Sequence, residues 1–246
     1  MTLKLLHWNI LYKEKIENIL ETIKKIKPDI LCLQELSQGF KYNNYIDTPK
    51  YLAQKLHYSY YFHKGIEGKN RTIGNGIFSR FPIIKTRFSY IKKPQPFTGW
   101  ADWTTEARIY VETLIEIHGK FISFATTHLS YNSRFIQSEE KKKEANTLVS
   151  IIRKKKSQYI LTGDFNSVPL SYTIDQVQDY LVNCGPNTKE KTWSTKPHRD
   201  KWEWEVNGLN WRLDYVFSTK DMTVKSSKIV NTPYSDHLPI VIEFTV

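Results

Sequence analysis

The sequence predicts an α/β fold in which helices cover β-sheets. Three observations support this: short apolar runs rich in Val, Ile, Phe and Tyr recur along the chain, helical spacing appears between only some of them, and turn residues separate the others. A chain of 246 residues that is 40% hydrophobic is long enough to bury one large core. We therefore expect a single domain over residues 1–246, built as a sheet-rich α/β sandwich.

Strands and helices alternate at the start of the chain. A strand is expected at 3–10, and a helix at 13–27 because four isoleucines and Leu20 recur at the spacing of one helical face before Pro28 stops it. The other elements expected in this half are a strand at 30–34, a helix at 50–56, and strands at 58–63, 74–79 and 83–90. Phe81-Pro82 forms the turn between the last two strands.

Strands also dominate the second half, around one long helix. The stretch 92–103 has two prolines, a glycine and three aromatic residues, and it predicts a long surface loop. The longest helix is expected at 133–156, since Glu139 and Glu140 load its first half with acid and basic residues load its end, as the helix dipole favours. The remaining expectations are strands at 108–117 and 120–127 joined at His118-Gly119, a strand at 158–162, a variable region at 170–210, and strands at 211–218, 223–230 and 238–246.

The chain is strongly basic and poor in cysteine. Lys and Arg number 36 against 25 Asp and Glu, so polyanions are concentrated near the surface; nucleic acid, an anionic membrane or a phosphorylated small molecule would all fit, as would a mere surplus of lysine. Cys32 lies in an apolar run, and two cysteines suggest no disulfide framework. The first residues show no leader and no long uncharged apolar stretch follows, so we expect a cytoplasmic monomer without a transmembrane segment.

Polar side chains collect where the predicted strands begin or end. Glu35 alone could be the first solvated residue beyond a buried strand, and Asp164 with Asn166 is ordinary turn chemistry. The full set is Asn9, Glu35, His128, Asp164, Asn166, Asp236 and His237. Because strand ends are held by a rigid scaffold yet face solvent or a cleft, the set predicts one rim able to bind a metal ion or a phosphate.

Seven motifs run through nearly the whole chain in a particular order. They are HWNI (7–10), LQE (33–35), GNGIFSRFPI (74–83), TTHL (126–129), GDFN (163–166), LDYVF (213–217) and SDHLP (235–239). In this order they resemble the motifs of the endonuclease/exonuclease/phosphatase superfamily, with GDFN and SDHLP the most specific. The resemblance implies a four-layered α/β/β/α sandwich, two packed mixed sheets flanked by helices, and metal-dependent hydrolysis of phosphoester bonds.

The same resemblance implies a metal site with few protein ligands. Glu35 would be the main Mg²⁺ ligand, with Mn²⁺ as a possible substitute, and Asn9 would orient the metal or the phosphate. Asp236 would reach the metal or its water. Mg²⁺ prefers oxygen ligands and is usually held by only one or two carboxylates, so such a sparse site is sufficient.

Five further residues would carry the catalysis by the same resemblance. Asp164 would position the attacking water, while Asn166 and His128 would hold phosphate oxygens. His237 would act as general base or as a phosphate-binding imidazole, oriented by Asp214. An imidazole suits either task because its ordinary pKa of about 6.5 lies near neutrality.

Two additional residues are candidate phosphate ligands. Arg108 opens the strand before His128 and could bind phosphate, or it could be a solvated strand-end arginine. Asn75 could face the cleft, although Gly74 and Gly76 beside it more simply indicate a bent backbone.

The segment 192–211 contains four tryptophans among charged residues. Such a segment can stack on bases of nucleic acid, insert at a lipid interface, or pack a long loop. A similar Thr-Trp pair followed by an Arg-x-Asp strand occurs in the branch of the family that removes tyrosyl adducts from DNA ends. Three interpretations of the tryptophans therefore stay open.

The sequence thus predicts a Mg²⁺-dependent phosphodiesterase acting on nucleic acid, either a nuclease or a DNA-end phosphodiesterase. Leu11 stands where apurinic-site endonucleases of the family carry an acid, which disfavours that branch. The alternatives are the same chemistry on a phospholipid or small phosphorylated metabolite, and a catalytically inactive binding protein of the same fold. The last is disfavoured because the whole set of acid, imidazole and amide residues is present.

Overall fold

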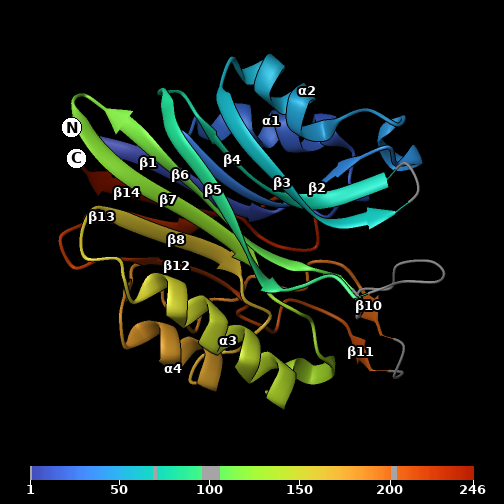
Figure 1. The fold of residues 1–246 in the computed structure, drawn as a ribbon. Helices are drawn as coiled ribbons and strands as arrows, with labels where there is room; N and C mark the ends of the chain where they lie inside the picture. The colour runs from blue at the N-terminus through green and yellow to red at the C-terminus, as the bar shows by residue number, and fades with distance from the viewer. Residues whose placement is uncertain (1, 69–70, 96–105, 201–203) are drawn as a thin grey trace.

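The computed structural model describes residues 2–68, 71–95, 106–200 and 204–246. Within these ranges two six-stranded sheets lie face to face, and helices cover the outer face of each (Figure 1). Helices α1 (Ile16–Ile26) and α2 (Thr48–Leu56) lie on one side, and α3 (Glu139–Ile152) and α4 (Tyr172–Gln178) lie on the other. The expected four-layered α/β/β/α sandwich is confirmed.

The first sheet joins the two ends of the chain. Its strand order is β13 (Thr223–Ile229), β14 (Ile240–Thr245), β1 (Thr2–Asn9), β2 (Ile30–Gln38), β4 (Arg71–Ser79) and β3 (Ser59–Gly68). β1 and β2 are parallel with α1 between them in the chain, and the other neighbours are antiparallel. The parallel pair therefore brings the carboxyl ends of β1 and β2 to the same edge.

The second sheet repeats this arrangement with other strands. Its order is β5 (Ile83–Lys92), β6 (Arg108–Ile117), β7 (Lys120–His128), β8 (Tyr159–Asp164), β12 (Asp214–Ser218) and β9 (Val182–Asn183). β7 and β8 are parallel, with α3 between them in the chain, so their carboxyl ends also meet. A small hairpin of β10 (His198–Arg199) and β11 (Glu205–Val206) stands apart from both sheets (Figure 1).

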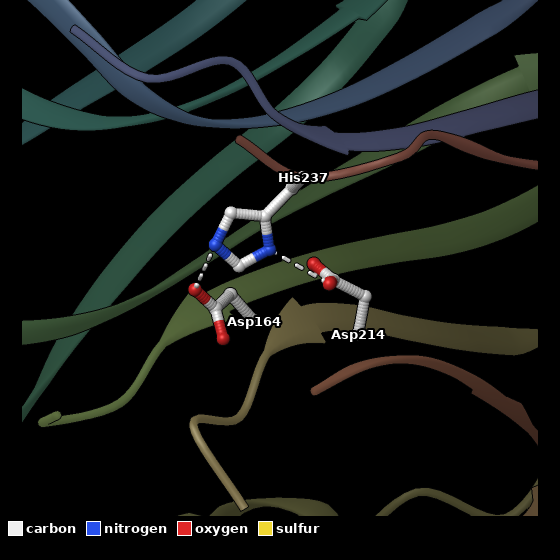
Figure 2. A group of neighbouring side chains, drawn as sticks. All are labelled: Asp164, Asp214 and His237. Carbon is white, nitrogen blue, oxygen red and sulfur yellow. Dashed lines mark hydrogen bonds and ion pairs between the residues drawn. The ribbon is translucent and has the colours of Figure 1, made fainter. Parts of the chain in front are cut away.

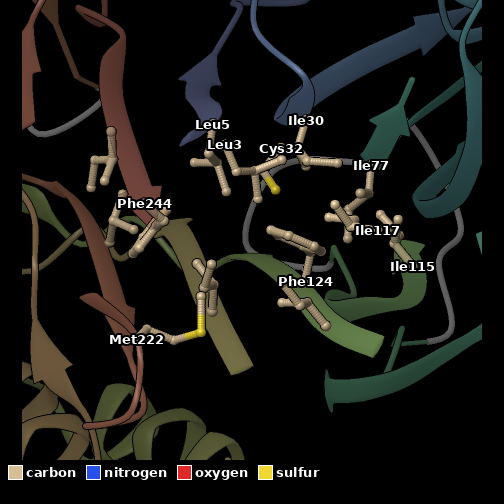
Figure 3. Packing of buried hydrophobic residues seen from close by; sticks show 14 of the residues in the cluster. Leu3, Leu5, Ile30, Cys32, Ile77, Ile115, Ile117, Phe124, Met222 and Phe244 are labelled. Carbon is tan, nitrogen blue, oxygen red and sulfur yellow. The ribbon is translucent and has the colours of Figure 1, made fainter. Parts of the chain in front are cut away.

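The main core fills the space between the two sheets. Along β1, Leu3 and Leu5 point into this space, whereas Leu6 and Trp8 pack under the helices, as the two-residue period of a strand requires (Figure 3). Opposing strands supply the other half of the core, including Phe124. β6 alone contributes Ile109, Val111, Ile115 and Ile117 to this core.

The long helix differs from the expected 133–156. α3 covers only Glu139–Ile152, and a short 3₁₀ turn at Ser133–Phe135 precedes it. Arg134 and Phe135 have positive φ values of 54° and 55°, a conformation that no α-helix continues through. Ser138 is the N-cap, its hydroxyl accepting from the backbone N–H of Lys141 at 3.2 Å, so the acidic run marks the first turn of the helix.

Other boundaries also differ from expectation. The variable region contains helix α4, which its mixed composition did not predict, and the last strands begin later than expected, at Asp214 and Ile240. The hairpin at His118-Gly119 is confirmed, with φ of 49° and 80° at its two turn residues. β5 runs to Lys92, and most of the loop expected at 92–103 lies outside the described residues. Among the described helices, none is long and apolar enough to span a membrane.

Candidate active site

The candidate site lies at one end of the space between the sheets, where the inward rows become polar. On β1 the row that begins with Leu3 and Leu5 continues to His7 and Asn9. On the second sheet the equivalent positions are His128, Asp164 and Asp214, and the strand register places both His128 and Asp214 opposite Asp164. Gly163 permits this close approach, because a Cβ atom there would lie 2.7 Å from the carbonyl oxygen of Thr127.

Glu35 enters the site through an irregularity in β2. Its strand continues to Gln38, and the register against β4 shifts between Leu33 and Leu36, so Glu35 sits at a bulge rather than beyond the strand end. The amide of Asn9 donates to Oε1 of Glu35 at 3.0 Å, and the backbone N–H of Tyr12 donates to Oε2 at 3.2 Å. Burial, and then the nearby carboxylate of Asp236, raise the pKa of Glu35 to about 7.

Four residues around the site adopt left-handed backbone conformations without being glycine. They are Leu11, Glu35, Asn166 and Ser235, with φ between 45° and 62°. Each costs roughly 1–2 kcal/mol for an ordinary L-residue, less for asparagine. Among the described residues nine other non-glycine residues also have positive φ, but a strained backbone at a site can direct side chains that a relaxed strand end would not.

Asp214, His237 and Asp164 form the centre of the site (Figure 2). His237 contacts Oδ2 of Asp214 through Nδ1 at 2.8 Å and Oδ2 of Asp164 through Nε2 at 3.5 Å. Among the described residues these three are also a group whose ligand atoms, within 4.8 Å of one another, could hold a metal ion. The imidazole is already bonded between the two carboxylates, which is typical of an oriented acid–base group.

The charges of this group are balanced within the protein. Burial alone would lower the pKa of His237, but the carboxylates of Asp214 and Asp164 outweigh it and raise that pKa well above its usual value. Burial would likewise raise the pKa of Asp214, but His237 and then His7 hold it below its usual range. The raised pKa favours the protonated form of His237, and with it the phosphate-binding role of the two that the sequence left open.

Asp164 links the two sheets across the site. Its Oδ2 accepts from the amide of Asn9 at 3.1 Å and lies 3.3 Å from Nε2 of His128. The side-chain amide of Asn166 lies 3.2 Å from Nε2 of His128, and the backbone N–H of Asn166 donates to Oδ1 of Asp164 at 2.9 Å. Burial, then the charges of Arg108 and His237, hold the pKa of His128 well below its usual value, so His128 is a neutral hydrogen-bonding group. Burial is also the main cause of a raised pKa at Asp164.

A cleft of about 600 Å³ opens onto these residues. Glu35, His128, Asp164, Asn166, Asp236, His237 and Arg108 all line it. Asp236 accepts a hydrogen bond at 3.1 Å from the indole N–H of Trp193, which closes one side of the cleft. Asn75 is buried, donates to the carbonyl of Ile109 at 3.3 Å, and lines a small adjoining cavity instead of the cleft. The structure thus brings the predicted residues together, with Asn75 behind them.

The donor set on the first-sheet side fits a divalent cation. The carboxylate of Asp236 raises the pKa of the Glu35 carboxylate, and a bound cation would offset the repulsion between the two charges. The oxygen of the Asn9 amide already accepts from the N–H of Leu11 at 3.1 Å, so Asn9 holds the Glu35 carboxylate in place rather than offering a free ligand.

The tryptophans of 192–211 that the structure describes are packed rather than splayed into solvent. Trp193, Trp204 and Trp211 surround Phe135 with ring centroids 5.1–5.6 Å from it. Of the three interpretations of this segment, loop packing holds for these residues, while Trp202 lies outside the described residues.

Sequence reasoning missed two buried residues of the site. His7 bonds Oδ1 of Asp214 at 2.9 Å, and its position two residues before Asn9 on the same strand face was the available signal. Lys141 is 1% exposed, and its ammonium donates to the carbonyls of Ser130 and Phe165, which follow β7 and β8. The sequence did not single out Lys141, because a run of three lysines is typical of a solvated helix face.

These features agree with the comparisons to known proteins. The profile of the Endonuclease/Exonuclease/phosphatase family matches residues 6–237, and the chain belongs to this family, whose members hydrolyse phosphoester bonds. A search of curated protein sequences finds no significant match.

Solved structures of the family share the fold at low sequence identity. A family protein from Leptotrichia buccalis is 21% identical, with a TM-score of 0.73, 99% of this chain covered and 100% of the other. Mannosyl-6-phosphatase Bt3783 of Bacteroides thetaiotaomicron is 19% identical, with a TM-score of 0.71 and coverage of 99% and 100%. D. rerio TDP2 complexed with single strand DNA product is 19% identical, with a TM-score of 0.70 and coverage of 100% and 99%. At these identities the likeness establishes the fold.

Proposed function

We propose that this protein is a Mg²⁺-dependent phosphodiesterase that cleaves nucleic acid. The observation that carries the proposal is that the cleft has two sides. One side carries the carboxylates of Glu35 and Asp236, and the charge of Asp236 raises the pKa of Glu35; the other carries His237, whose ring lies between the carboxylates of Asp214 and Asp164. The first side suits a cation and the second suits a phosphate and its attacking water. Mn²⁺ is expected to substitute, since it takes the same oxygen ligands.

In this proposal the ion is held by Glu35 and Asp236, with Asn9 fixing Glu35. When bound there, the ion would supply Lewis-acid chemistry to the phosphoryl group and to the leaving oxygen. The protein residues place the phosphate: the His237 imidazolium and the amide of Asn166 donate to non-bridging oxygens, and Asp214 fixes the imidazole.

Asp164 orients the attacking water in the same scheme. Its Oδ2 is within 3.5 Å of His237 and His128, and its pKa is raised by burial, which suits a carboxylate that accepts a proton. His128, as a neutral imidazole, donates to phosphate. Arg108 lines the same cleft, where it is buried and paired with Glu106 at 3.1 Å rather than solvated at the strand end, and it adds a positive charge to this wall. Asn75 lines the small cavity beside it.

The charge of the chain supports nucleic acid as the substrate. The net charge of +11 provides sequence-independent attraction to a polyphosphate, and Lys13, Arg108 and Arg199 all line the cleft. The relative of known structure that holds a single-stranded DNA product belongs to the same fold family, as does the sugar phosphatase.

The test is a substrate panel run with Mg²⁺, with Mn²⁺ and with chelator. It comprises plasmid, abasic duplex, single-stranded oligonucleotide, 5′-tyrosyl DNA, mannose 6-phosphate, a phospholipid and bis(p-nitrophenyl) phosphate. Metal-dependent turnover of a nucleic acid that is lost in Glu35→Ala and His237→Ala supports the proposal. The matched controls are Glu17→Ala and His118→Ala, at exposed positions outside the cleft. Turnover of only the sugar phosphate or the lipid would reject nucleic acid as substrate.

A further inference from the structure

A cluster of aromatic side chains borders the cleft on the Glu35 side. We name Tyr12, Phe40 and Tyr42, together with Tyr45 of the same loop, the tyrosine platform. The backbone N–H of Tyr45 donates to the carbonyl of Phe40 at 2.9 Å. The ring centroids of Tyr12 and Phe40 are 5.2 Å apart, and those of Tyr12 and Tyr42 are 6.2 Å apart. Tyr12 also lines the cleft, and its backbone N–H donates to the carboxylate of Glu35. The platform is therefore in direct contact with the candidate metal site.

The outer members of the platform are exposed. Tyr42 is 44% exposed and Tyr45 is 67% exposed, in contrast to Trp193 of the packed tryptophan cluster at 3%. Asn44 and Tyr45 have consecutive positive φ values of 52° and 61°, a costly turn for residues other than glycine. This turn presents a large ring to solvent, where it contributes little to the core.

Each of the other three rings has a cation beside it. The ammonium of Lys13 lies 5.4 Å from the centre of the Tyr12 ring, and that of Lys41 lies 5.8 Å from the Tyr42 ring. The guanidinium of Arg71 lies 5.7 Å from the Phe40 ring. Aromatic rings interleaved with cations are the combination that binds unpaired nucleotides, because the rings stack on bases and the cations contact phosphates.

The platform is held rigidly in relation to the site. The buried side chain of Asn43 accepts from the backbone N–H of Ile16 at 2.8 Å and donates to the carbonyls of Glu14 at 3.1 Å and Tyr12 at 3.3 Å. These bonds fix the loop that carries Tyr42 and Tyr45 to the loop that follows β1. A preorganised surface of this kind loses little entropy on binding.

We infer that the tyrosine platform binds the unpaired nucleotides of a single strand that runs out of the cleft beside the scissile phosphate. This inference rests on the proposed function and narrows its substrate to nucleic acid with a single-stranded segment. A paired duplex has no free base faces for these rings. The continuity of the platform with the cleft and its complement of cations both favour a nucleic acid strand over a lipid surface.

The binding test uses fluorescence anisotropy of a fluorescein-labelled single-stranded oligonucleotide, in chelator so that nothing is cleaved. The double variant Tyr42→Ala, Tyr45→Ala is expected to bind about 5- to 150-fold more weakly for each stacked base that is lost. Tyr42→Phe with Tyr45→Phe keeps the rings and is expected to bind as the wild type does. Tyr180→Ala, 46% exposed and directly after α4, is the matched control.

Hydrolysis of bis(p-nitrophenyl) phosphate with Mg²⁺ is expected to be the same in all these variants, because this substrate has no strand to stack. Equal oligonucleotide affinity in the alanine and wild-type proteins would overturn the platform, as would an equal loss for a fully paired duplex. Binding of anionic phospholipid vesicles but not of the oligonucleotide would also overturn it. If the wild type hydrolyses no phosphodiester, the proposed function fails on its own, whatever the anisotropy shows.

Discussion

Glu35 and Asp214 are both carboxylates at the polar end of the space between the sheets, and the protein surrounds them differently. Glu35 has a neutral amide, a backbone N–H and another carboxylate nearby, and its pKa is raised by burial and by Asp236 to about 7. Asp214 lies between His237 and His7, and its pKa is lowered despite burial. Where the protein supplies the positive charge itself, the carboxylate orients a partner; at Glu35 the raised pKa is consistent with the proposal that a cation from solution binds there.

The largest expected effect is on the uncompensated side. Glu35→Gln keeps the shape and the bond from Asn9 but removes the charge that holds the ion. Turnover of bis(p-nitrophenyl) phosphate should fall on the order of 10³-fold, since a metal ion stabilises the transition state by several kcal/mol. The loss should diminish at high Mg²⁺ concentration, measured by steady-state kinetics. An unchanged Mg²⁺ dependence would place the ion elsewhere.

On the compensated side, Asp214→Asn should lower kcat by roughly 10²-fold, comparable to the loss of one hydrogen-bond donor to the transition state. The reason is that His237 loses the carboxylate that fixes its orientation and keeps it protonated. The pKa of His237 should fall in this variant, and NMR titration of its ring measures the change. A normal kcat with a shifted titration would show that the charge of His237 is not used.

The two sides should also differ in how the ion stabilises the fold. Mg²⁺ at 100 times its dissociation constant should raise the free energy of unfolding by about 2.7 kcal/mol. Glu35→Gln should lose this gain, while Asp214→Asn should keep it, because only the former removes a charge from the proposed metal site. Thermal unfolding with chelator and with Mg²⁺ measures both. Loss of the gain in Asp214→Asn alone would move the ion to the group of Asp164, Asp214 and His237.

Local strand and helix patterns predicted a sheet-rich α/β sandwich, and the resemblance of the motifs to a known family implied its four layers. The same patterns placed the polar candidate residues at strand ends, which the structure brings together. Strand periodicity located most strands, and residues such as Asp164 and His237 flank apolar runs that are easily recognised. Boundaries set by backbone conformation were missed: positive φ at Arg134 and Phe135 shortens α3, and a bulge keeps Glu35 inside β2. Neither the positive φ values nor the bulge can be predicted from residue type, since both arise from tertiary packing.

The sequence patterns also did not predict residues whose role depends on contacts formed in the folded protein. Lys141 looked like one of three consecutive surface lysines, yet it alone faces inward, because the helix turns its neighbours toward solvent. The platform tyrosines follow no periodic pattern in the sequence. Their clustering is seen only in the structure, where the loop at 40–47 packs against the loop after β1.

A substitution of Lys141 tests whether catalysis depends on the hydrogen bonds that hold the loops after His128 and Asp164 together. Its ammonium joins the carbonyls that follow His128 and Asp164, so Lys141→Met should let these two loops separate slightly. We expect kcat to fall about tenfold, as for other outer contacts of catalytic groups, with KM for the small diester unchanged. Lys143→Met, at an exposed neighbouring position, is the control. A fall in melting temperature with kcat intact would make the role of Lys141 purely structural.

The smallest effect concerns Glu14, which links the loop after β1 to the loop before β14 near the tyrosine platform. Its carboxylate accepts from Lys196 at 2.6 Å, from the backbone N–H of Ser235 at 3.1 Å and from Asn18 at 2.9 Å. Burial would raise the pKa of Glu14, but these donors, Lys196 first, lower it below its usual 4.5. A carboxylate with a lowered folded pKa stabilises the protein above the unfolded pKa and loses that contribution as the pH falls through the folded pKa.

Glu14→Gln should therefore cost about 1 kcal/mol of stability at pH 7, a modest value because the pair with Lys196 is partly exposed. The difference from wild type should shrink as the pH falls below 4.5, which urea unfolding at several pH values measures. Glu17→Gln on α1, at an exposed position, is the control. A constant difference at all pH values would mean that Glu14 acts through shape rather than charge, and that the link between the loop after β1 and the loop before β14 does not depend on this ion pair.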